Sequence, residues 1–69
     1  MDRKSSSISY YASFITVTAI QEPGAEAELE SIEIYGQLLE FEDADVTSGK
    51  TLDEAINNGL RVATQAVDN

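Results

Sequence analysis

We predict an α+β fold for this 69-residue chain, with a small antiparallel sheet of about three strands covered on one face by a single C-terminal helix. Three observations support this prediction. Residues 7–20 are rich in Ile, Val, Thr, Tyr and Phe, which favour strands. Glutamates alternate with apolar residues over 25–35, and the last third has apolar residues at spacings of three and four. One helix over one face of an antiparallel sheet is a stable two-layer arrangement.

The first 24 residues predict a flexible start, one long strand and a turn. Residues 1–6 are charged or polar, so we expect a flexible N-terminus followed by a single domain over 7–69. The strand predicted over 7–20 has apolar residues on both faces, which suits a central position or an edge that pairs with another chain. Gln21 to Gly24 contains the only proline, and Pro-Gly favours a type II turn.

The segment Ala25 to Tyr35 fits either a strand or a sparse helical stripe, and we prefer the strand because Ile-Glu-Ile-Tyr alternates cleanly. A β-bulge near Glu30-Ser31 would keep all its apolar groups on one face. Gly36 marks a bend, and 37–42 predicts a further strand with Leu39 and Phe41 inward.

A polar loop over 43–50 leads to a helix that begins at Thr51. Thr51-Leu52-Asp53-Glu54 has the pattern of a capping box, in which the Thr51 hydroxyl accepts from the Glu54 amide and the Glu54 carboxylate accepts from the Thr51 amide. Gly59 lies within the broad apolar face of this helix. Glycine in a helix costs up to about 1 kcal/mol relative to alanine, so its presence there needs a reason. A close approach of the helix to the sheet would supply one.

The charge is strongly negative and unevenly placed. Thirteen acidic residues face four basic ones, for a net charge of −9, and no basic residue lies between Ser5 and Gly49. Such a field repels nucleic acids and anionic membranes and attracts basic surfaces. We therefore expect a basic protein partner, with no direct binding of nucleic acid or membrane. The residues expected to bind it are Glu26, Glu28, Glu30 and Glu33 in one row, Glu40 and Glu42 in another, and Asp43 and Asp45 in the loop.

Catalysis and cofactor binding have little support in the composition. The chain has neither cysteine nor histidine, and its four glycines are scattered, so it lacks a recognisable nucleophile–base pair, a zinc site and a phosphate loop. We expect a protein that binds a partner rather than an enzyme, with no cofactor. The absence of cysteine and of a secretory signal leads us to expect it in the cytoplasm of a bacterial host cell.

Residues 43–54 resemble the calcium-binding loop of EF-hand proteins, with oxygen-bearing side chains at positions one, three and five and Glu54 at position twelve. Ser48 stands where that family has glycine, and Lys50 stands where it has an apolar residue. An acidic loop before a capped helix accounts for the same residues without metal. We therefore expect no metal site.

The stretch Thr47-Ser48-Gly49-Lys50-Thr51-Leu52-Asp53-Glu54-Ala55 resembles the start of the first helix in HicB-type antitoxins, which has a Gly-x-Thr-Leu-x-Glu-Ala pattern. That resemblance implies a protein that neutralises a small toxin ribonuclease by binding it. This is our alternative prediction of function.

In size, charge and layout the chain is similar to small acidic bacteriophage inhibitors that mimic DNA, including anti-CRISPR proteins and inhibitors of host DNA enzymes. This resemblance implies rows of carboxylates that occupy the basic site of a nucleic-acid-binding protein of the bacterial host. It is our leading prediction of function.

A third interpretation is a structural subunit or homodimer that associates through the 7–20 strand, with Tyr10, Tyr11 and Phe14 as the candidate contact.

Overall fold

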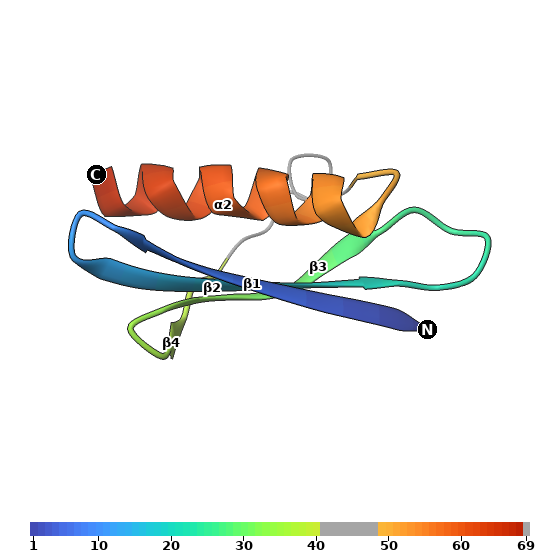
Figure 1. Ribbon diagram of the computed structural model, residues 1–69, viewed down its shortest axis with the longest axis horizontal. Helices are drawn as coiled ribbons and strands as arrows, with labels where there is room; N and C mark the ends of the chain where they lie inside the picture. The colour runs from blue at the N-terminus through green and yellow to red at the C-terminus, as the bar shows by residue number, and fades with distance from the viewer. Residues whose placement is uncertain (41–48, 69) are drawn as a thin grey trace.

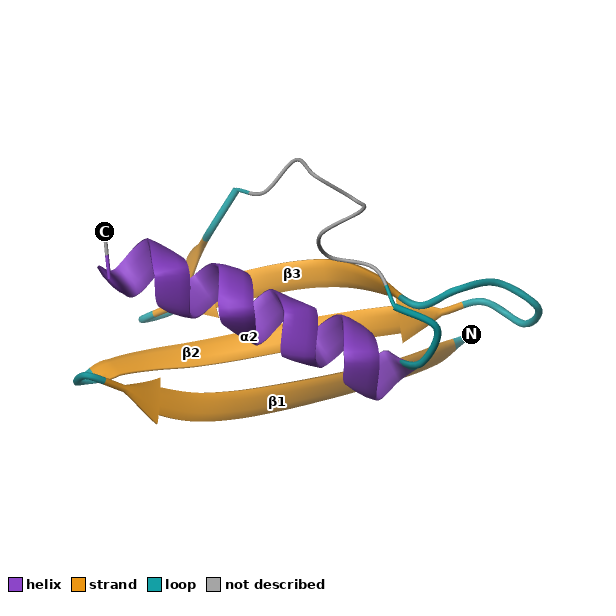
Figure 2. Cartoon of the chain, turned by 90° about the horizontal axis from the view of Figure 1, so that it is seen from above, coloured by secondary structure: helices purple, strands orange, loops and turns teal. Residues whose placement is uncertain are grey.

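The computed structural model describes residues 1–40 and 49–68. It contains strands β1 (Asp2–Tyr10), β2 (Ser13–Gln21), β3 (Glu28–Ile34) and β4 (Gln37–Leu38), and helix α2 (Leu52–Asp68). The strands form one antiparallel sheet in the order β1-β2-β3-β4. Helix α2 lies across one face of that sheet, and no described element covers the other face (Figures 1 and 2). The predicted α+β class is confirmed, with four strands rather than about three.

The single strand predicted over 7–20 is wrong, because the chain turns back at Tyr11-Ala12. Strand β1 runs from Asp2 to Tyr10 and pairs along its whole length with β2. The residues from Asp2 to Ser6, expected as a flexible start, are therefore part of the sheet. Tyr11 and Ala12 both have positive φ, 47° and 65°. This geometry suits a two-residue hairpin, but glycine or asparagine usually marks it in a sequence.

The turn between β2 and β3 follows the prediction. The Ala25 amide donates to the Glu22 carbonyl at 3.1 Å, and Gly24 has φ 78°, as a type II turn requires. The strand interpretation of 25–35 is also confirmed, since β3 spans Glu28–Ile34 and pairs with β2.

Strand β4 is much shorter than the strand predicted over 37–42. It follows a turn at Tyr35-Gly36, where both residues have positive φ, and it contains only Gln37 and Leu38. Leu39 nevertheless lies inward as expected, because it packs against the core and its amide donates to the Ile32 carbonyl at 2.8 Å. Phe41 lies outside the described residues.

One of the two capping hydrogen bonds predicted at the start of α2 is present, and the other has a different partner. The Glu54 amide donates to the Thr51 hydroxyl at 3.2 Å. The Glu54 carboxylate, however, accepts from the Lys50 amide at 2.9 Å instead of the Thr51 amide. The carboxylate thus satisfies a backbone donor one residue further out, and it still places negative charge at the helix N-terminus, where the helix dipole favours it.

The core lies between α2 and the sheet. Its fully or nearly fully buried apolar residues are Ile15, Val17, Ala19, Ala27, Ile32, Ala55, Ile56 and Ala63. The helix approaches closely at Gly59, where an added Cβ would lie 2.8 Å from both Val17 Cγ1 and Leu29 Cδ1. This confirms the predicted reason for the glycine.

Strand β1 also holds the helix near both of its ends. Lys4 forms an ion pair with Asp53 in the first turn of α2, and the Tyr10 hydroxyl donates to Asp68 at 3.0 Å in the last turn.

Candidate functional site

The open face of the sheet can be assigned from the strand register, because directly paired residues in an antiparallel sheet point to the same face. Ile15, Val17 and Ala19 of β2 are buried under α2, so the alternate residues of β2 face away from the helix. The open face is then formed by Arg3, Ser5, Ser7 and Ser9 of β1, Phe14, Thr16, Thr18 and Ile20 of β2, and Glu28, Glu30, Ser31 and Glu33 of β3.

The acidic residues of β3 share this face because of a β-bulge. Thr18 pairs with Ser31, but the next residue, Ala19, pairs with Leu29, which leaves Glu30 as the extra residue. The bulge predicted near Glu30-Ser31 is therefore confirmed. Without it the alternation would turn either Leu29 or Ile32 outward, and Glu28 and Glu33 would lie on opposite faces.

Only one of these glutamates is paired with a cation. Arg3 reaches across the sheet to Glu30, with Nε 2.8 Å from Oε2 and Nη2 3.2 Å from Oε1. The Nη2–H group donates to Oε1 and Nε lies close to Oε2, so two guanidinium nitrogens face the two carboxylate oxygens. Among the described residues, Glu28 and Glu33 have no such cation, and they carry the uncompensated charge of β3.

The other acidic residues predicted to bind a partner are placed differently. Glu26 is exposed just before β3, next to Ala27, whose backbone pairs with that of Gly49. Glu40 is exposed beyond the end of β4, so the expectation of a second strand row beginning there is wrong. Glu42, Asp43 and Asp45 lie outside the described residues. The structure therefore brings together Glu28, Glu30 and Glu33 of the predicted set.

An apolar patch lies beside the acidic residues, at the end of the sheet near the β1–β2 and β3–β4 turns. Its members are Phe14, Tyr35 and Leu38, which are 51%, 63% and 71% exposed. The Tyr35 amide donates to the Phe14 carbonyl at 2.9 Å, and Leu38 pairs with Glu33. Sequence reasoning missed Tyr35 and Leu38. The only signal for them was the predicted bend at Gly36, which they flank.

Of the three residues predicted as an oligomer contact, Tyr10 and Tyr11 touch each other, with their rings edge to face and the ring centroids 4.6 Å apart. Tyr11 lies in the exposed turn and Phe14 on the open face. Tyr10 is on the helix face, where its ring packs against the core. The hydrogen bond to Asp68, followed by partial desolvation and the Asp68 charge, raises the pKa of Tyr10 above its usual 10.0.

The centre of the open face is neutral and internally hydrogen-bonded. Ser5 and Thr18 hydroxyls lie 2.9 Å apart across the β1–β2 pair, and those of Ser7 and Thr16 lie 3.0 Å apart. Cross-strand hydroxyl pairs of this kind stabilise a two-stranded ladder.

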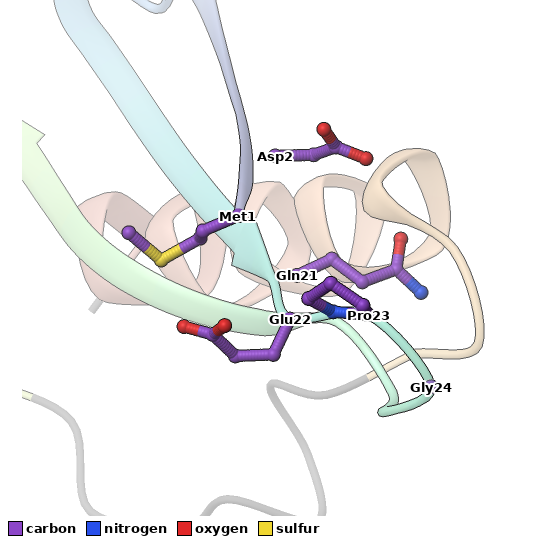
Figure 3. Close-up of a pocket in the computed structure, with 6 residues that line it drawn as sticks. All are labelled: Met1, Asp2, Gln21, Glu22, Pro23 and Gly24. Carbon is purple, nitrogen blue, oxygen red and sulfur yellow. The ribbon is translucent and has the colours of Figure 1, made fainter.

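A hollow at the other end of the sheet is a poor candidate for a ligand site. It is lined by Met1, Asp2, Gln21, Glu22, Pro23 and Gly24 (Figure 3). The carboxylates of Asp2 and Glu22 point away from each other, whereas a ligand site needs convergent polar groups. The Gln21 amide is already engaged, since it donates to the carbonyls of Ala25 and Lys50, both at 3.0 Å.

Metal binding and membrane insertion find no support in the described ranges. Residues 1–40 and 49–68 contain no group of three or more acidic, histidine or cysteine side chains that could hold a metal ion. Half of the segment that resembles an EF-hand loop, residues 43–48 of 43–54, lies outside them. Within those same ranges no helix combines the length and apolar character needed to cross a membrane. Comparison of the chain with protein-family models, curated protein sequences and solved structures gives no significant match.

Proposed function

We propose that this protein is a small acidic inhibitor that binds a basic, nucleic-acid-binding protein through the open face of its sheet. The observation that supports this is the bulge at Glu30, which gathers Glu28, Glu30 and Glu33 on a face that no described element covers. The protein acts in this proposal by binding alone, without catalysis or a cofactor. The partner is a protein of the bacterial host whose Lys and Arg side chains otherwise hold phosphates.

The charge of the face supplies attraction and orientation. Glu28 and Glu33 pair with Ile20 and Thr16, which are four residues apart on β2, so the two carboxylates are held on one face at a separation of roughly 13 Å. Because Arg3 neutralises Glu30, Glu28 and Glu33 carry most of this attraction. Long-range attraction of this kind raises the association rate and weakens with salt.

The neighbouring apolar patch supplies a part of the affinity that salt does not screen. Large exposed side chains such as Phe14, Tyr35 and Leu38 are the type that anchors protein interfaces when they enter a partner's pockets. We therefore expect binding with a charged component from β3 and an apolar component from the adjacent turns.

The test is to capture partners from bacterial lysate at low salt, identify them, and measure nucleic-acid binding by the purified partner with and without this protein. We expect a DNA- or RNA-binding protein whose activity falls when the wild-type chain is added. A Glu28→Lys/Glu33→Lys variant should lose this inhibition.

The matched control is Asp2→Lys/Glu22→Lys, which changes the net charge equally. Asp2 pairs with Gln21 on the helix face and Glu22 lies in a turn, so both are outside the proposed surface. Equal inhibition by the two variants, with both shown to be folded by circular dichroism, would contradict a role for the open face.

A second candidate function is that of a HicB-like antitoxin, and it is favoured by the packing of Gly49. A Cβ at this position would lie 2.6 Å from Glu54 Cβ and 2.7 Å from the Ala55 nitrogen. The glycine, the Thr51 cap and Glu54-Ala55 thus form one packed unit, which supports the resemblance of this segment to the antitoxin helix start. The unit is also a sound helix start in any protein, so this candidate is ranked second.

The antitoxin proposal makes a different prediction about the partner. It expects a small ribonuclease encoded beside this protein, whose activity on RNA the chain abolishes on mixing. Co-expression of the neighbouring reading frame with this chain, followed by co-purification at high salt and an RNA cleavage assay, tests it. A neighbouring product that neither co-purifies nor cleaves RNA would exclude this function.

A further inference from the structure

Strand β1 forms an edge of the sheet, and its outer side pairs with no other strand in the part of the chain that the structure describes. The two-residue turn at Tyr11-Ala12 makes Tyr10 and Ser13 a hydrogen-bonded closing pair. Antiparallel strands alternate between bonded and non-bonded pairs. The backbone amides and carbonyls that point outward from β1 therefore belong to Arg3, Ser5, Ser7 and Ser9.

This edge has little of the protection that usually prevents edge pairing. Sheet edges are commonly blocked by proline, bulges or charged side chains along the strand. In β1 the charges are confined to the first three residues, Asp2, Arg3 and Lys4, and the following Ser5 to Tyr10 are neutral. Its register with β2 is continuous, and the hydroxyl pairs from Ser5 and Ser7 hold it in place.

We propose that β1 pairs with β1 of a second copy of this chain, antiparallel about Ser6, so that the two sheets join into one. All nine residues of each strand overlap in this register. The charged end of one copy then lies opposite the neutral end of the other, with Asp2 opposite Tyr10, Arg3 opposite Ser9, Lys4 opposite Ile8 and Ser5 opposite Ser7. A register centred on Lys4 would instead set two lysines directly against each other, which is unfavourable.

The charge distribution favours self-pairing at this edge. The β1 strand carries two of the four basic residues of the chain, whereas Glu28 and Glu33 lie on β3, two strands away. In the joined sheet the two β3 strands are five strand spacings, or about 24 Å, apart. That distance exceeds the Debye length of about 8 Å at physiological salt, so the repulsion between the acidic faces is largely screened.

The helices also leave room for the second copy. Helix α2 packs mainly against β2 and β3 and less against β1. The two β2 strands of the joined sheet are three spacings, or about 14 Å, apart. Packed helices need an interaxial distance of only about 8–10 Å, so the two helices do not collide. Both acidic faces end up on the same side of the joined sheet.

The experiment is sedimentation equilibrium of the purified chain over a wide concentration range, at low and high salt. We expect the mass to double with rising concentration and the dimer to strengthen with salt. Ser7→Pro removes an outward amide donor from each copy, which an edge strand tolerates, and should raise the dimer dissociation constant by at least about tenfold. Ser7→Ala is the matched control: it loses the bond to Thr16 but keeps the amide, so it should still dimerise.

A second variant, Ser7→Lys, covers the case in which the proline unfolds the protein. It leaves the backbone intact and places a charge one residue from the centre of the proposed pairing, so it should be folded and monomeric. Hydrogen exchange provides the local measurement, because the amides of Arg3, Ser5, Ser7 and Ser9 should be protected in the dimer only.

A wild-type chain that stays monomeric at all concentrations would overturn the proposal. So would a folded Ser7→Lys dimer, or a dimer in which those four amides exchange freely. Self-pairing strengthens with salt and partner binding weakens with it, so either proposal can fail without the other.

Discussion

Gly59 is the residue at which helix and sheet come closest. Glycine is unfavourable inside a helix because of its backbone freedom, yet any side chain at this position would meet Val17 and Leu29. The chain therefore accepts a local cost in helix propensity in order to bring the backbone of α2 close to β2.

We expect Gly59→Ala to lower the free energy of unfolding by about 1 kcal/mol, because overpacking costs roughly 1–3 kcal/mol and the gain in helix propensity is only about 1 kcal/mol. Urea denaturation monitored by circular dichroism measures it. Ala66→Gly, at an exposed position of the same helix, is the control for propensity alone and should destabilise the protein by about 1 kcal/mol. A more stable Gly59→Ala variant would mean that α2 can move away from the sheet at no cost.

Tyr10 links β1 to the last turn of α2, where no basic residue balances the helix dipole. The Asp68 bond disfavours the tyrosinate and raises the pKa of Tyr10 in the folded state. A raised folded-state pKa means that the stabilisation is fully present below pH 10, the usual tyrosine value, and is lost as the pH rises through the folded-state value.

We expect Tyr10→Phe to be less stable than the wild type at neutral pH, with the difference shrinking above pH 10. Thermal melts of both proteins over a pH series measure this difference. Tyr11→Phe serves as the control, because the Tyr11 side chain is largely exposed in the turn. A difference that does not change with pH would show that the Tyr10 hydroxyl does not stabilise the fold through Asp68.

Among the elements, the β1–β2 hairpin has the turn whose residues suit its backbone conformation least, because neither Tyr11 nor Ala12 favours a positive φ. Ala12 has φ 65°, in the left-handed region that costs a residue with a side chain roughly 1–2 kcal/mol. The pairing of nine residues on each side outweighs that cost.

Ala12→Gly should therefore stabilise the protein by about 0.5–1 kcal/mol, since relief of the left-handed strain exceeds the added entropy of glycine in the unfolded chain. Chemical denaturation of the variant measures the gain. Ala25→Gly, in the next turn along the chain but without a positive φ, should not stabilise it. If Ala12→Gly destabilised the protein, the Tyr11-Ala12 turn would have a different backbone conformation.

The whole molecule carries a net charge of −9, and its described ion pairs, Arg3–Glu30 and Lys4–Asp53, are at the surface. Exposed pairs contribute about 0–1 kcal/mol each and weaken with salt. Repulsion among the unpaired carboxylates acts against the compact state, and salt weakens it too. The excess of acidic residues makes the repulsion the larger effect.

We therefore expect the melting temperature to rise with added sodium chloride. A Glu28→Gln/Glu33→Gln variant should melt higher than the wild type at low salt and gain less on salt addition, because it removes two unpaired charges from the open face. Calorimetry at low and high ionic strength measures both effects. A melting temperature that falls with salt would show that the two surface ion pairs outweigh the repulsion.

Five features could be predicted from sequence patterns alone: the fold class, the turn at Pro23-Gly24, the bulge near Glu30, the side-chain cap at Thr51 and the close approach at Gly59. These features share a physical cause, since each follows from local steric demands or from an alternation of apolar and charged residues within a few positions. The bulge is the most consequential of them for the candidate site, because it was needed to keep Leu29, Ile32 and Ile34 on one face.

Three features depend on long-range pairing and could not be predicted: the start of β1, the short length of β4, and the set of residues on the open face. The turn at Tyr11-Ala12 has no glycine or asparagine to mark it, and the polar start of β1 has no apolar alternation, so cross-strand pairing alone orders that segment. Likewise Phe14, Tyr35 and Leu38 come together through strand register across three strands, which no local pattern encodes. The negative charge was evident from composition, but its concentration on β3, away from the edge strand β1, follows from the order of the strands in the sheet.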